Sequence, residues 1–183
     1  MAGINELATM LGWRRGHEEY TFLWAFLAVS VGLAQDKPSL AGNWKLDIAQ
    51  SEFGSGPAPK SVAGTIFKDT PQMFSYRSHG IDDKGKPFSE SWSGPEDGSM
   101  HPTLVNGKPG GQAGYTREPD GTLAQRGEDA DGTTFEARIS MSPDGNTSTI
   151  EGTSKSKDGK ESREKQVWHR VGKPASQRLH ARP

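Results

Sequence analysis

The 183-residue chain contains no cysteine. This absence excludes disulfide bonds, thiolate nucleophiles and thiolate metal ligands. Hydrophobic residues make up 31% of the chain and aromatic residues 8%. Both shares are low for a globular protein, and composition alone would permit disorder. Evidence for a fold must therefore come from the order of the apolar residues along the chain rather than from their number.

The chain also lacks an excess of charge of either sign. Lys and Arg number 22 and Asp and Glu number 23. No basic run is longer than a dipeptide, and the aromatic residues are not interleaved with Lys and Arg. Proteins that bind nucleic acid need such clusters to neutralise phosphates and to stack bases. We therefore expect no nucleic-acid partner.

A long apolar run occurs only near the start, at residues 21–34. It follows a pair of arginines, is short for a membrane span, and ends in Gly32-Leu33-Ala34, with small residues at the −3 and −1 positions of a signal-peptidase site. We predict a signal peptide over residues 1–34 with a long n-region, and cleavage before Gln35 on the general secretory route. The protein would then be periplasmic or extracellular, with no stable membrane insertion. An uncleaved membrane anchor is the alternative.

The rest of the chain is expected to form one domain. Residues 35–39 are a short polar linker, residues 40–171 are the domain, and residues 172–183 form a polar, basic tail that we predict to be disordered. The domain is long enough to bury a single core.

The first predicted strand begins near Leu40 and contains Trp44, Leu46 and Ile48 at every second position, between polar residues. This alternation is typical of a strand with one buried face. Gly42 leaves room beside the Trp44 indole. After this strand we expect Ser51 to cap a single helical turn. Nine further extended runs follow, with no sustained helical period: residues 61–68, 72–79, 87–93, 99–105, 113–117, 122–127, 133–141, 147–154 and 161–171.

Turn signals separate these runs at regular intervals. They include Asn106-Gly107, Asp131-Gly132 and Asp158-Gly159, where glycine supplies the positive φ that tight hairpins need. An uninterrupted series of hairpins predicts an all-β fold, an up-and-down antiparallel β-barrel of eight to ten short strands. A β-sandwich is the alternative.

The Gly42-Asn43-Trp44 segment resembles the Gly-x-Trp signature of the first strand of lipocalins and of the wider calycin group. In that group a basic residue late in the last strand stacks on the tryptophan and closes the barrel end. The matching residue here is Arg170, and a guanidinium on an indole forms a favourable cation–π contact. The resemblance implies that Gly42, Trp44 and Arg170 have a structural role in closing the barrel.

More of the chain, from about Leu40 to Val171, is similar to small exported lipocalin-like proteins of acidobacterial type. Lipocalins often hold small apolar molecules, whereas those exported proteins have no assigned activity. This chain departs from typical lipocalins because it has no disulfide cysteines and few inward-facing aliphatic residues. The segments that carry the likeness are residues 40–47, 51–61, 80–87 and 167–170.

Aromatic side chains on the middle strands are the candidate ligand-binding residues. They are Phe74, Tyr76, Phe88, Trp92 and Tyr115. Aromatic residues in a small barrel also serve as plain core, so that alternative stays open. From the sizes of the inward residues we expect an interior that is packed near Trp44 and more open beside residues 87–117.

No motif indicates catalysis, a metal or a cofactor. The histidines lack ligand spacing. The acidic run at residues 128–132 lacks the spacing of a calcium loop and fits a solvated turn, and no serine lies in a Gly-x-Ser-x-Gly elbow.

The sequence thus favours an exported lipocalin-like protein that binds a small, partly apolar molecule without catalysis. A structural or protein-interaction barrel of the cell envelope, filled with side chains, is the alternative, and an enzyme is the third hypothesis. Oligomeric state is not indicated.

Overall fold

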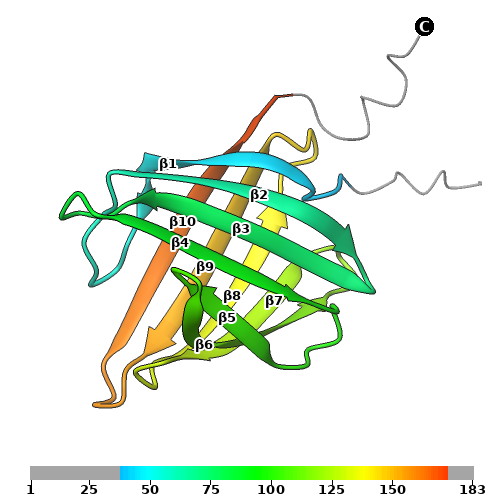
Figure 1. The fold of residues 1–183 in the computed structure, drawn as a ribbon. Helices are drawn as coiled ribbons and strands as arrows, with labels where there is room; N and C mark the ends of the chain where they lie inside the picture. Colours follow the sequence, from blue (N-terminus) through cyan, green and yellow to red (C-terminus); the bar gives the residue numbers. More distant parts are fainter. Residues whose placement is uncertain (1–37, 173–183) are drawn as a thin grey trace, which may run out of the picture. The chain divides into compact units, whose positions relative to one another are not determined.

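The structure is a computed structural model that describes residues 38–172 (Figure 1). Within this range the chain forms ten strands and no helix. No helix that could span a membrane was found in these residues. The strands are β1 (Gly42–Glu52), β2 (Ser61–Thr70), β3 (Met73–Ile81), β4 (Pro87–Gly94), β5 (His101–Val105), β6 (Lys108–Arg117), β7 (Leu123–Asp129), β8 (Thr134–Met141), β9 (Thr147–Lys155) and β10 (Glu161–Val171).

The strands close into a barrel in which each strand pairs with its neighbours in the sequence, and β10 returns to pair with β1. All pairings are antiparallel. Figure 1 shows this meander as a continuous change of colour around the barrel. The predicted up-and-down antiparallel barrel is therefore confirmed, and the sandwich alternative is not the fold. Closure leaves no edge strand exposed.

The predicted turns fall between these strands. At the β5–β6 hairpin, Asn106 has φ 51° and Gly107 has φ 75°. Two consecutive positive φ values define the type I′ turn that matches the twist of a two-residue hairpin. The Asn-Gly pair therefore fixes where the chain reverses.

Strand β1 has the predicted alternation at its start, where Trp44 is 3% exposed and Leu46 5% exposed. The predicted helical turn at Ser51 is wrong, because β1 continues to Glu52. Its pairing with β10 shifts between Asp47 and Glu52, as in a β-bulge. The Ser51 hydroxyl donates to the Asp47 carbonyl (2.6 Å) and accepts from the Val167 N–H (3.0 Å). These hydrogen bonds replace the backbone hydrogen bonds between β1 and β10 at the point where β1 bends.

One end of the barrel is solidly packed. It is the end where the chain enters at Leu40 and leaves after β10. A cluster of buried side chains fills it: Leu40, Trp44, Phe74, Trp92, Ala113, Tyr115, Leu123 and Ile139. The interior is packed near Trp44, as predicted. The expected opening beside residues 87–117 is wrong, because Trp92, Ala113 and Tyr115 belong to the packed cluster. Packing changes along the barrel axis, from this closed end towards the opposite end, and not from one side of the wall to the other.

Two arginines seal the closed end. The Arg170 Cζ lies 4.2 Å from the centroid of the Trp44 ring, so the expected stack is present. Arg117 bonds both oxygens of Glu96 (2.9 and 2.7 Å) and also pairs with Asp69. The side chains of Glu96 and Asp69 are only 1% and 6% exposed, so two buried carboxylates share one partly exposed guanidinium. Sequence reasoning did not find this network.

The predicted signal peptide, residues 1–34, lies outside the described residues, as does almost all of the predicted tail, residues 172–183. Both stay predictions.

Candidate binding cavity

The barrel interior contains a cavity of about 500 Å³. All ten strands contribute lining residues. Its floor is formed by aromatic side chains of the packed cluster, Trp44, Phe74 and Tyr115. Its walls are formed by aliphatic and aromatic side chains that were not among the predicted ligand-binding residues. These wall residues include Leu46, Val62, Phe135, Ile150 and Trp168. The space therefore begins above the packed cluster and extends toward the other end of the barrel.

Four of the five predicted ligand-binding residues border this cavity: Phe74, Tyr76, Phe88 and Tyr115. Trp92 does not line it. Trp92 is 3% exposed and packs behind the floor, with ring centroids 4.5 Å from Tyr115 and 6.1 Å from Phe74. Its indole N–H donates to the Ala113 carbonyl (3.0 Å). The structure therefore gives Trp92 the position of a core residue that supports the floor.

A chain of hydrogen bonds rises from the floor to the wall. The Tyr115 hydroxyl donates to the Tyr76 hydroxyl (3.4 Å), which donates to Oε1 of Glu90 (2.5 Å). Burial raises the pKa of Tyr76 well above its ordinary value, and the charge of Glu90 adds to the shift. Burial likewise raises the pKa of Tyr115. Both hydroxyls therefore stay protonated, and the Tyr76 hydroxyl holds the Glu90 carboxylate in a fixed position beside the floor.

Three further acids border the cavity: Asp129 on β7, Glu136 on β8 and Glu164 on β10. Glu136 alternates with inward residues of β8, so Asp129 and Glu164 are the two that face the interior. Burial raises the pKa of Asp129, and the neighbouring charges of Asp131, Glu90 and Glu164 raise it further. Burial also raises the pKa of Glu164, as does the charge of Glu90. The charge of Glu90 thus raises the pKa of both Asp129 and Glu164 across the interior.

Side-chain alternation is the signal that could have identified these acids. On β4, Glu90 lies midway between Phe88 and Trp92, both of which the sequence placed on the inward face, and alternate residues of a strand share a face. Asp129 follows Leu123 by six residues on β7, so it shares the face of that fully buried side chain. The residues were overlooked because acids in such strands were assigned to turns and to solvent.

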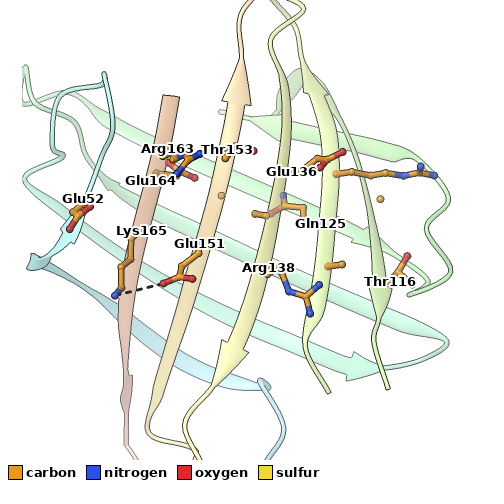
Figure 2. Close-up of a pocket in the computed structure, with 15 residues that line it drawn as sticks. Glu52, Thr116, Gln125, Glu136, Arg138, Glu151, Thr153, Arg163, Glu164 and Lys165 are labelled. Carbon is orange, nitrogen blue, oxygen red and sulfur yellow. Dashed lines mark ion pairs between the residues drawn. The ribbon is translucent and has the colours of Figure 1, made fainter. Parts of the chain in front are cut away.

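A second concavity, of about 680 Å³, lies over strands β6 to β10 and is also bordered by Glu52 of β1. Figure 2 shows charged side chains from neighbouring strands along it, including the ion pair between Lys165 and Glu151 (3.7 Å). Lys165, Glu151 and Arg138 occupy one cross-strand row and are about half exposed or more. Exposed charges that alternate in sign from strand to strand satisfy one another in solvent. This surface is therefore a weaker candidate for a small-molecule site than the interior.

The structure places three neighbouring residues in a constellation with the composition of a catalytic triad. The Ser99 hydroxyl donates to Oδ1 of Asp97 (2.5 Å) and lies 3.0 Å from Nε2 of His101. In a hydrolytic triad the acid orients the histidine, and the histidine takes the serine proton. Here the acid accepts the serine proton itself, in an exposed loop. This is the geometry of a polar turn.

Within residues 38–172, no group of three His, Asp or Glu side chains is placed to hold a metal ion. The acidic run at residues 128–132 ends β7 and forms the predicted turn, in which Oδ1 of Asp131 accepts the Thr133 N–H (2.8 Å). Asp129 of that run differs from the others because it faces the cavity.

Comparison with known proteins identifies no family for this chain. No family model matches the chain, and no curated protein matches it. Similar solved structures include a redesigned β-barrel (TM-score 0.45, covering 73% of this chain and 92% of that one) and a de novo designed fluorescence-activating β-barrel (0.44, 73% and 94%). Another is an S-type phycobiliprotein lyase from Guillardia theta (0.42, 73% and 89%). Each is 14% identical to this chain, which is too low to indicate what the chain binds.

Proposed function

We propose that this protein is a lipocalin-like binding protein that takes a small, partly apolar molecule into the barrel interior and does not catalyse a reaction. The observation that carries the proposal is the cavity of about 500 Å³ above an aromatic floor. Small-molecule sites usually enclose roughly 300–1,000 Å³, with mostly apolar walls and a few placed polar groups. The Glu90–Tyr76 pair is such a placed polar group.

The cavity exists because several inward positions carry small side chains. Ala137 on β8 lines the cavity together with Ser78 and Ser154, and its cross-strand partner on β9 is Gly152. Larger residues at these positions would fill the interior, as expected for a barrel with only a structural role. The size of the cavity therefore favours binding over the filled structural barrel.

The lipocalin-like character of the proposal is supported by Gly42, Trp44 and Arg170. Their arrangement joins the first and last strands in the way that the resemblance implied. Export to the periplasm or the cell exterior is proposed from the sequence of residues 1–34. Mature protein that begins at Gln35, identified by intact mass, would support export, and soluble cytoplasmic protein that retains the leader would contradict it.

The binding proposal is tested by titrating purified protein with N-phenyl-1-naphthylamine, a neutral probe whose emission rises in apolar surroundings. We expect saturable binding with Kd below roughly 100 μM, which corresponds to about −5.5 kcal/mol. Ala137→Phe should abolish binding, because the new ring occupies the cavity. Thr134→Phe is the matched control, since Thr134 is exposed on the same strand. Absence of saturable binding to the parent protein would favour the filled structural barrel.

A further inference from the structure

We propose that the ligand of this cavity is an organic cation, a protonated amine or quaternary ammonium group attached to an apolar body. This inference rests on the proposed binding function and adds the charge of the ligand. It is drawn from three features of the cavity: acids on three sides of its wall, the orientation of its one basic lining residue, and the aromatic floor.

The acids of the cavity come from three separate strands. Glu90 is on β4, Asp129 on β7 and Glu164 on β10, and all three line the same space. Glu90 is half-buried, whereas Asp129 and Glu164 are exposed. They do not form a cluster that could hold one metal ion. None of them is in an ion pair with a residue of the described chain. Negative charge is thus distributed around the cavity without a protein counter-ion.

The cavity receives no basic side chain from the described residues. Arg77 is the one basic residue that borders it, and it alternates with the inward Tyr76 and Ser78 on β3, so its side chain belongs to the outer face. Glu136 borders the cavity in the same way from β8, where it is exposed between the inward Phe135 and Ala137. The charged side chains that face the interior are therefore all acidic.

The floor next to Glu90 suits a cation for a second reason. The rings of Phe74, Tyr76 and Tyr115 pack against one another with centroids 5.0–6.4 Å apart. The faces of such rings attract ammonium groups, most strongly where water is excluded. An ammonium group placed between this floor and Glu90 would meet both a carboxylate and aromatic faces. The apolar body of the ligand would then lie along the aliphatic wall formed by Leu46 and Ile150.

The electrostatics of the cavity acids also favour a bound cation. Partial burial raises the pKa of Asp129, and the charges of Asp131 in the adjacent turn and of Glu90 raise it further. Partial burial and the charge of Glu90 also raise the pKa of Glu164, so the ionised forms of both acids are disfavoured in the empty cavity. A bound cation reverses that effect, whereas a bound anion adds to the repulsion. The cavity thus discriminates by charge even among ligands of one shape.

The test compares three ligands that share one ring system and differ in charge: 1-naphthylmethylamine, 1-naphthalenemethanol and 1-naphthoic acid. Each displaces N-phenyl-1-naphthylamine from the full protein at pH 7.5. We expect the amine to bind at least tenfold more tightly than the alcohol, and the acid to bind most weakly. Glu90→Gln should weaken binding of the amine at least tenfold and change binding of the alcohol less than threefold. Glu136→Gln, which removes the same charge from an outward position, should change neither.

The possible failures are distinguishable. If the neutral probe binds and the alcohol or the acid equals the amine, the charge inference is overturned and the binding function stands. If neither the probe nor any of the three ligands binds, both fail. Should Glu90→Gln not fold, Asp129→Asn and Glu164→Gln serve in its place, and an unchanged preference for the amine in both variants would overturn the inference.

Discussion

The guanidinium of Arg170 lies on the indole of Trp44, with Cζ 4.2 Å from the ring centroid, and this contact joins the last strand of the barrel to the first. The same guanidinium donates to the carbonyls of Ala41 (2.7 Å), Ser39 (2.7 Å) and Gly145 (2.6 Å). Arg170 therefore ties the entering chain and the β8–β9 turn to one aromatic ring. The closed end depends on these contacts.

The first prediction concerns Gly42, which makes room for the guanidinium rather than for the indole as the sequence led us to expect. A Cβ at this position would lie 2.5 Å from Nη1 of Arg170, and its φ of +140° is unfavourable for other residues. Gly42→Ala should therefore lower the free energy of unfolding by about 1–3 kcal/mol. Gly64→Ala is the matched control, because a Cβ there has ordinary contacts of 3.7 Å or more. Equal urea midpoints for the two variants would contradict the prediction.

The second prediction concerns the stack itself. Trp44→Ala should cost about 3–5 kcal/mol as truncation of a buried aromatic residue. Arg170→Ala should cost about 1–2 kcal/mol through loss of the cation–π contact. Because the two side chains touch, the loss in the double variant should be smaller than the sum of the single losses. Urea unfolding of the four proteins measures this coupling, and strict additivity would show that the contact contributes nothing.

The third prediction concerns the network of Arg117, Glu96 and Asp69. Arg117→Met leaves two buried carboxylates without their cation and should lower stability by about 3–5 kcal/mol. Adding Glu96→Gln to this variant should restore part of the loss, since one uncompensated charge is removed. Lys165→Met breaks an exposed ion pair and should change stability by less than about 1 kcal/mol. A similar small effect for Arg117→Met would mean that the network does not stabilise the closed end.

Local patterns predicted the fold well because hairpins are local. All ten strands lie where apolar alternation and glycine turns placed them, with shifts at their ends. Strand β6 differs most, since it begins at Lys108 rather than at residue 113, in a stretch of glycine and polar residues that pairing with β5 and β7 makes extended. Propensity cannot reveal a strand whose conformation is imposed by its neighbours.

The interior was harder to predict because it depends on strand stagger and on pairs distant in the sequence. Asp69 and Arg117 are 48 residues apart and meet only after closure. The register of the whole sheet likewise decides that Trp92 packs behind the floor while Phe88, four residues earlier on β4, borders the cavity. Alternation gives the face of each residue, but the depth of that residue along the barrel axis is set by the sheet.

The fourth prediction concerns pH. Asp129 and Glu164 have pKa values raised above their ordinary values of 3.8 and 4.5, mainly by burial. A carboxyl group with a raised folded pKa binds its proton more tightly in the folded state, so its ionisation destabilises the fold at neutral pH. Asp129→Asn and Glu164→Gln should therefore raise the urea midpoint of ligand-free protein at pH 7.5. The gain should disappear as the pH falls through the folded pKa values toward the unfolded ones, because both states are then protonated.

Asp131 provides the control, because its substitution is expected to change the urea midpoint in the opposite direction. It lies two residues from Asp129, and the hydrogen bond from the Thr133 N–H lowers its pKa. Its ionised form is favoured in the folded state, so Asp131→Asn should lower the urea midpoint at pH 7.5, and this loss should fade as the pH falls through its folded pKa. If Asp129→Asn and Glu164→Gln instead lower the midpoint at pH 7.5 as Asp131→Asn does, the cavity acids are stabilised by partners in the empty protein. The cavity would then have no uncompensated negative charge with which to select a cation.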